Sequence, residues 1–218
     1  MGSVIGGLLP LAVGVAISPI PIIAAILMIL SKNAGGAAKG FAVGWVAGIL
    51  VVTGVMTLLA GTLGGSDSEP STGASIVKII LGAALVVLAV IQWQERSQTE
   101  VPGWMKAIDT LTPVKALGLG ALLSGVNPKN LLLCVSAGVA IGAGGLSAGG
   151  DLIAIVVFTL LASVTVLAVV LGYMLAADKL GPMLDSLRQW LQLNNHAVMA
   201  IVLLIMGMVV VGKGIGGL

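Results

Sequence analysis

The stretch 124–134, SGVNPKNLLLC, places a proline, two asparagines and a lysine inside a long apolar run. A proline in a helix interior costs about 3 kcal/mol, and a lysine at the centre of a bilayer costs roughly 2.5–3.5 kcal/mol. The surrounding chain of 218 residues is 58% hydrophobic and 8% charged, with a mean hydropathy of +1.18. Ordinary soluble domains carry about 25% charged residues. The composition therefore predicts an all-α polytopic membrane protein in which this stretch interrupts a membrane helix.

Apolar runs of about 20 residues, the length that crosses a bilayer, occur six times. The expected spans are Val4–Leu30, Gly36–Leu63, Ser75–Trp93, Val114–Ala140, Leu152–Ala177 and Ala197–Gly214. Because six is an even number, both termini are expected on one side of the membrane.

Basic residues are distributed unevenly between the two predicted sides. The links after the first, third and fifth spans carry Lys32, Lys39, Arg96, Lys106, Lys115, Lys179 and Arg188, whereas the other side has only Lys78 and Lys213. Since short cytoplasmic loops are enriched in Lys and Arg, the pattern predicts cytoplasmic links and both termini outside.

The sequence also indicates an internal duplication. Pro19 and Pro128 occupy matching places in the two halves, and the same spacing relates Gly36 to Gly145. Three spans in each half would make the repeats inverted, a pattern that recurs in secondary transporters with sites near the midplane. The expected organisation is a single transmembrane domain (1–218) with a first three-helix repeat (1–94), a cytoplasmic link (95–113) and a second repeat (114–218). An amphipathic segment near 178–194, interpreted as lying in the membrane interface rather than docking a partner, belongs to the second repeat.

Both interruptions have the sequence of a helix start. Ser18 precedes Pro19 and Asn127 precedes Pro128; Ser and Asn are favoured N-caps and proline is favoured at the first helical position. Helix N-termini attract anions, so two such ends near the midplane predict an anion-friendly site.

Lys129 lies at the start of the second of these helices, and no Asp or Glu falls inside the predicted spans to neutralise it. Three interpretations stay open: the side chain snorkels to the interface, it loses its charge, or it meets an anionic ligand. Asn127 and Asn130 either satisfy the backbone freed by the break or contact a substrate.

Other polar and small residues have less specific interpretations. Gly40, Gly44 and Gly48 recur one turn apart, a pattern of close helix packing, either between the two halves or across a homodimer. Hydroxyl groups at 159, 163 and 165 either line a pathway or bond back to their own helix. Cys134, the only cysteine, is interpreted as a packing residue.

Several functional classes are disfavoured. The net charge of +2 without a basic cluster argues against nucleic-acid binding. The predicted spans lack the aspartate pair or the Ser–His pair that intramembrane proteases need, and they lack metal ligands. We therefore expect no enzyme activity, no cofactor and no bound metal.

At the two breaks, "SPIPIIAAILMIL" and "NPKNLLLCVSAG", the sequence resembles the lysine-exporter (LysE) superfamily, and most closely the actinobacterial GAP or sulfolipid-addressing family. The resemblance implies six spans in two inverted three-helix repeats and a role in moving glycolipids to the cell surface. It also implies a bacterial plasma membrane location. The residues expected to form the substrate site are Ser18, Pro19, Pro21, Ser124, Asn127, Pro128, Lys129 and Asn130.

These observations together predict a secondary-type exporter of an anionic or amphiphilic substrate, with membrane lipids as its surroundings. The alternatives are an exporter of a small amino-acid-like metabolite and a non-transporting accessory subunit of a lipid-export machine.

Overall fold

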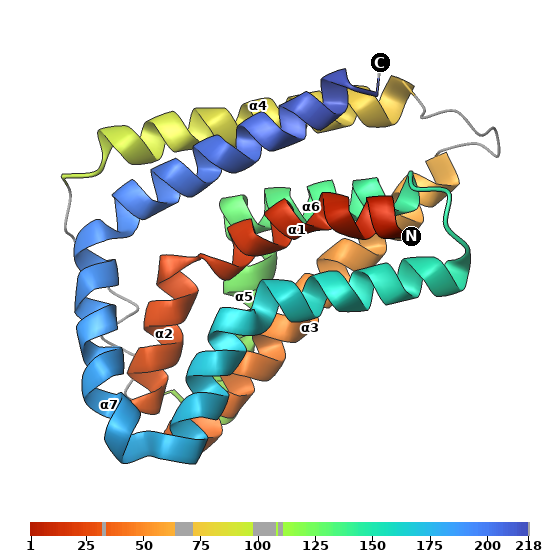
Figure 1. Cartoon of the computed structure of the whole chain (residues 1–218). Helices are drawn as coiled ribbons and strands as arrows, with labels where there is room; N and C mark the ends of the chain where they lie inside the picture. The colour runs from red at the N-terminus through yellow and green to blue at the C-terminus, as the bar shows by residue number, and fades with distance from the viewer. Residues whose placement is uncertain (32–33, 64–71, 98–107, 109–110, 218) are drawn as a thin grey trace.

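The computed structural model describes residues 1–31, 34–63, 72–97, 108 and 111–217. These residues form an all-α structure (Figure 1). Its α-helices are α1 (Gly2–Ala16), α2 (Pro19–Ile29), α3 (Ala34–Leu63), α4 (Thr72–Gln94), α5 (Pro113–Gly125), α6 (Pro128–Gly142) and α7 (Ala148–Ile215). Most of the link between the second and third predicted spans (64–71) and most of the predicted link at 95–113 lie outside the described residues.

The described helices confirm an integral membrane protein with several crossings. Four stretches are long and apolar enough to span a bilayer: Gly35–Thr62, Gly73–Gln94, Ala148–Ala176 and Leu180–Ile215. The pair α1 and α2, bent by 54° at the break, provides a fifth when counted as one span. The predicted span Val114–Ala140 corresponds to α5 and α6, which have 13 and 15 residues. Each is shorter than the roughly 20 residues that a straight span needs.

The helix α7 contains both of the last two predicted spans. Its backbone leaves helical geometry at Ala176 (φ −150°, ψ 52°), and the chain reverses there, so that the two parts run along different sides of the molecule (Figure 1). The N- and C-termini lie at the same end of the helices (Figure 1). Which side of the membrane that end faces stays a prediction.

Glycines set the spacing between α3 and α5. A Cβ atom at Gly40 would lie 2.3 Å from the carbonyl oxygen of Pro113, and one at Gly44 would lie 1.9 Å from that of Leu117. Because such distances are far below van der Waals contact, only glycine allows the two backbones to approach so closely. The packing role predicted for this face is confirmed, and the partner is the other half of the same chain. A homodimer through this face would require α5 to leave it, and it stays a prediction.

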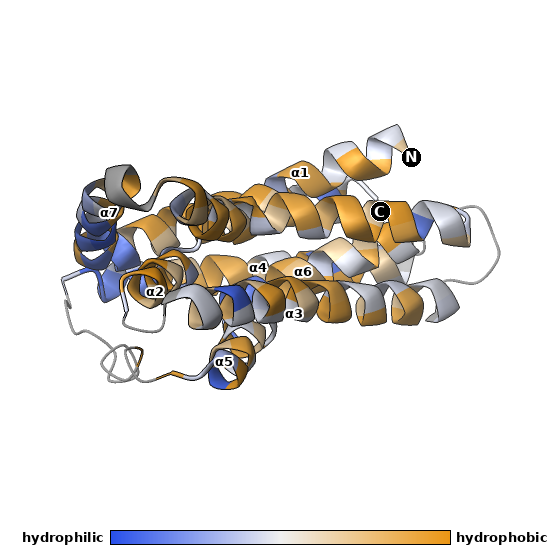
Figure 2. Cartoon of the chain, turned by 90° about the horizontal axis from the view of Figure 1, so that it is seen from below, coloured by the Kyte–Doolittle hydropathy of each residue, from blue (hydrophilic) through white to orange (hydrophobic). Residues whose placement is uncertain are grey.

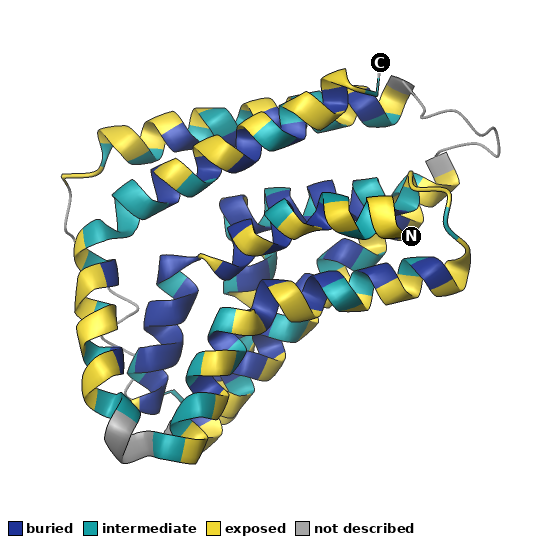
Figure 3. Cartoon of the chain, in the orientation of Figure 1, coloured by how far each residue is buried: buried dark blue, intermediate teal, exposed yellow. Residues whose placement is uncertain are grey.

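The amphipathic part of α7 covers α2 instead of lying entirely on the membrane surface. Leu184 and Leu191 are buried against Ile22, Ile23 and Ile26 of α2, and Figure 3 shows α2 buried over nearly its whole length. The other apolar residues predicted for the same face, Met183, Leu187 and Trp190, are exposed. The segment therefore serves protein packing on one side and presents apolar side chains outward on the other.

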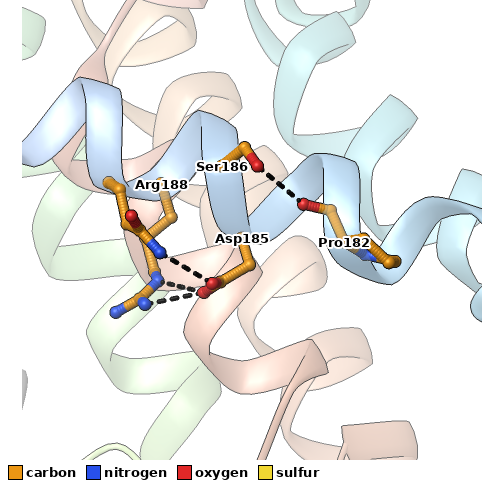
Figure 4. Close-up of polar contacts among 5 residues, drawn as sticks. Pro182, Asp185, Ser186 and Arg188 are labelled. Carbon is orange, nitrogen blue, oxygen red and sulfur yellow. Dashed lines mark hydrogen bonds and ion pairs between the residues drawn. The ribbon is translucent and has the colours of Figure 1, made fainter.

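Polar side chains lie on the outer surface of the same segment. Arg188 donates two hydrogen bonds to Oδ1 of Asp185 at 2.6 and 2.9 Å, and Ser186 donates to the carbonyl oxygen of Pro182 at 3.0 Å (Figure 4). Figure 2 shows this part of α7 as hydrophilic against otherwise largely apolar helices. Exposed ion pairs contribute little stability because water screens them, so the burial of Leu184 and Leu191 dominates the attachment of this segment to α2.

Candidate functional site

The two helix breaks form where the sequence places prolines behind polar residues. Ser18 is extended (φ −110°, ψ 104°) and Pro19 begins α2; Asn127 leaves helical geometry (φ −59°, ψ 120°) and Pro128 begins α6. A proline at the first helical position costs no hydrogen bond, because that N–H has no partner inside the helix. The predicted helix starts at both breaks are therefore confirmed.

The two breaks meet in space. Nζ of Lys129 donates to Oγ of Ser18 at 2.8 Å and to the carbonyl oxygen of Ile17 at 3.0 Å, residues that precede it by 111 and 112 positions. The Ser18 hydroxyl also lies 2.9 Å from Oδ1 of Asn130, whose amide nitrogen donates to the carbonyl oxygen of Leu123 at 3.0 Å. We call Ile17, Ser18, Lys129 and Asn130 the break cluster.

The three polar side chains of the break cluster are buried, whereas the Ile17 side chain is 42% exposed. Lys129 is 2% exposed, Ser18 2% and Asn130 0%. Lys129 therefore does not snorkel, and the first of its three interpretations is wrong. Its Nζ atom lies instead at the end of α1, where the last carbonyl oxygens of a helix carry a partial negative charge.

The Ser18 hydroxyl has one proton and two acceptors within reach. The carbonyl oxygen of Val15 lies 2.7 Å from Oγ, and Oδ1 of Asn130 lies 2.9 Å from it. Because a hydroxyl donates only one hydrogen bond, the two acceptors compete for it. Ser18 occupies the N-cap position of α2 but makes no side-chain capping bond, whereas Oδ1 of Asn127 accepts from the backbone N–H of Lys129 at 3.1 Å. Capping is thus confirmed for Asn127 and wrong for the Ser18 side chain.

The N-terminus of α2 offers fewer backbone donors than an ordinary helix start. Pro19 and Pro21 have no N–H, and the N–H of Ile22 already bonds to the carbonyl oxygen of Ser18 at 3.3 Å. Among the first three residues of α2, only Ile20 has a backbone N–H. The side chain of the break cluster that can carry a positive charge is Lys129.

Two predicted site residues lie apart from these hydrogen bonds. Ser124 is buried, donates to the carbonyl oxygen of Ala121 at 3.1 Å, and packs against α3 at Gly48. Pro21 is buried one turn into α2, and its ring has no hydrogen-bonding group to offer. Pro19 and Pro128 start the helices but likewise donate nothing to the break cluster.

A residue outside the predicted set joins the first break. Oγ1 of Thr165 in α7 donates to the carbonyl oxygen of Ala16 at 2.6 Å. The sequence showed a hydroxyl there but gave no sign that it bonds to another helix. Further along the same helix, Thr159 and Ser163 are buried with hydroxyl groups that have no partner in the described part of the chain. Cys134 is buried and free, as its predicted packing role requires.

Among the described residues, no group of three or more His, Cys, Asp or Glu side chains could hold a metal ion. The break cluster combines a lysine amine, a hydroxyl and an amide held between two helix ends. Such groups recognise anionic or strongly polar ligands by hydrogen bonding.

Comparison with known proteins identifies the family to which the chain belongs. No curated protein and no solved structure matches the chain. The family model described as Sap, sulfolipid-1-addressing protein, matches residues 8–216, nearly the whole chain. The resemblance noted at the two proline breaks is thereby confirmed, and the chain belongs to the sulfolipid-1-addressing protein family.

Proposed function

We propose that this protein is a secondary-type exporter that moves an anionic amphiphile, of the glycolipid kind suggested by the family description, across the bacterial plasma membrane. The observation that carries the proposal is the buried Lys129 ammonium held between two broken helices. Broken helices that meet inside the membrane form the substrate sites of many secondary transporters. On this proposal the protein is a carrier and not an enzyme.

The proposal includes six crossings in two inverted repeats. Counted as one interrupted crossing, α5 and α6 would complete the five spans already described. The break in that crossing would then correspond to the break between α1 and α2. Support comes from the matching start of α2 and α6 at prolines and from the contact between the two breaks.

Substrate binding would work by exchange at Lys129. In the described conformation, the carbonyl oxygen of Ile17 takes the place that an anionic headgroup would occupy. A sulfate or phosphate carries a full charge and accepts stronger hydrogen bonds than a carbonyl, so it would displace Ile17 from the ammonium. Loss of that bond would free the joint between α1 and α2, and α2 could then move with the amphipathic part of α7.

The unpartnered hydroxyls of Thr159 and Ser163 support a polar route along α7. In an apolar interior an unsatisfied hydroxyl is unfavourable. Contact with a passing polar headgroup or its water would satisfy it.

The test is transport in proteoliposomes with two fluorescent glycolipids that differ only in one sulfate group, measured with and without a proton gradient. We expect the purified protein to move the sulfated lipid faster than the neutral one. Lys129→Met, which removes the charge and keeps the length, should abolish the difference, and Lys115→Ala on the exposed start of α5 should preserve it. Equal transport by wild type and Lys129→Met would refute the site.

Movement of neither lipid, combined with efflux of a small amino acid, would overturn the lipid reading in favour of a small-metabolite exporter. Movement of neither lipid and no amino-acid efflux, with lipid movement restored by a cell-membrane extract, would instead identify an accessory subunit.

A further inference from the structure

A continuous groove runs between α3 and α7, away from the break cluster. Its larger part has a volume of about 710 Å³, and a smaller hollow of about 200 Å³ adjoins it at the end of α2. The two share Lys39, Val170 and Met174. The larger volume lies within the range of about 300–1,000 Å³ that is typical of ligand pockets.

Small side chains leave the space that forms the groove, and larger side chains line its sides. Ala42 and Ala47 of α3 leave space between the helices, while Leu50 of α3 and Leu167 and Leu171 of α7 line its sides. Leu50 and Leu171 are exposed, so the groove opens outward, and it lies within two segments that can span the membrane. Its occupant must therefore come from the apolar part of the bilayer.

One end of the groove has a different chemistry. Lys39, in the second turn of α3, is exposed, and among the side chains that the structure describes it is the one charged group that lines either hollow. Tyr173 lines the adjoining hollow and carries a hydroxyl group. Lysines near a membrane surface attract anionic lipid headgroups, and a tyrosine hydroxyl can donate a further hydrogen bond.

We propose that this groove is a binding site for one anionic phospholipid of the surrounding leaflet, with an acyl chain between α3 and α7 and its phosphate at Lys39 and Tyr173. The combination of an apolar trough and a cation at its end matches a molecule with an apolar tail and an anionic head. The site is separate from Lys129 and does not depend on the exporter proposal.

The experiment is native mass spectrometry of the purified full chain, titrated with phosphatidylglycerol or with phosphatidylcholine of the same acyl chains. Wild type should bind one phosphatidylglycerol in preference to phosphatidylcholine. Lys39→Ala should weaken phosphatidylglycerol binding about five-fold, the effect of roughly one lysine near an anionic surface. Ala47→Phe should fill the trough and reduce the binding of both lipids.

Two control variants separate this site from general effects. Lys115→Ala removes an exposed lysine that does not line the groove, and Ala83→Phe adds the same bulk to an exposed position of α4. Both should bind phosphatidylglycerol as wild type does.

A photoactivatable phosphatidylglycerol should label peptides from both α3 and α7 in wild type, and less in Ala47→Phe. Equal weakening by Lys39→Ala and Lys115→Ala would overturn the proposal, because it would show general attraction to positive charge. Labelling elsewhere in the chain, or a dimer that excludes lipid from the groove, would also overturn it.

Discussion

Replacing Lys129 by methionine or by alanine separates the two roles that the break cluster gives this residue. Methionine keeps the length of the side chain and removes its charge, whereas alanine also removes the packed stem. In the structure the ammonium bonds to Ile17 and Ser18 and is sealed from solvent. The two substitutions therefore have the same effect on charge and different effects on packing.

The magnitudes follow from these contacts. Lys129→Met leaves the carbonyl oxygen of Ile17 without its donor, a cost of about 1–3 kcal/mol. It also removes an ammonium group whose burial costs several kcal/mol, so the two effects oppose each other. We therefore expect the free energy of unfolding of Lys129→Met to lie within about 1–2 kcal/mol of the wild-type value. Lys129→Ala adds a cavity, which in buried large-to-alanine substitutions costs about 2–5 kcal/mol.

The assay has two readouts on the same preparations. Unfolding in mixed micelles, followed by tryptophan fluorescence, gives the free energy of unfolding, and transport of the sulfated lipid in proteoliposomes gives the function. We expect Lys129→Ala to be about 3 kcal/mol less stable than Lys129→Met and both to lose transport. A methionine variant as unstable as the alanine variant would refute the reasoning about charge burial. A methionine variant that transports normally would show that the charge is not used.

Three further substitutions test the packing and the joints. Gly44→Ala should lower the free energy of unfolding by about 1–3 kcal/mol or more, because its Cβ would lie 1.9 Å from the carbonyl oxygen of Leu117. Gly54→Ala is the control: a Cβ atom at Gly54 would have no neighbour within 4 Å, so this variant should not lower the free energy of unfolding. Thr165→Val removes the 2.6 Å hydrogen bond to the last residue of α1 and should cost about 1 kcal/mol in the same unfolding assay, so an unchanged value would contradict the bond. Pro128→Ala should reduce transport more than membrane expression, because it lets α5 continue toward α6; poor expression with normal transport per molecule would indicate a purely structural proline.

Local features of this chain were predictable because they depend on a few neighbouring residues. Proline removes an N–H and fixes its own backbone angle, so Pro19 and Pro128 mark helix starts whatever surrounds them. The long apolar runs likewise require a membrane, since no soluble core of this size could bury them. The sequence also predicted close helix packing at Gly40, Gly44 and Gly48, but it did not predict which helix packs there.

Contacts between distant residues could not be predicted in the same way. The Ile17 carbonyl that receives the Lys129 ammonium lies 112 positions away, and it is free only because α1 ends there. Likewise, serine is a residue type that often caps helices, yet the Ser18 hydroxyl bonds to the carbonyl oxygen of Val15 and lies beside Asn130. These contacts form because the second break is packed against the first. The residues around each break were enough to predict where the helices end, and the apolar runs were enough to predict a membrane protein. Which groups satisfy the broken helix ends depends on how the helices pack, because a hydrogen bond requires its donor and acceptor to lie close together in space.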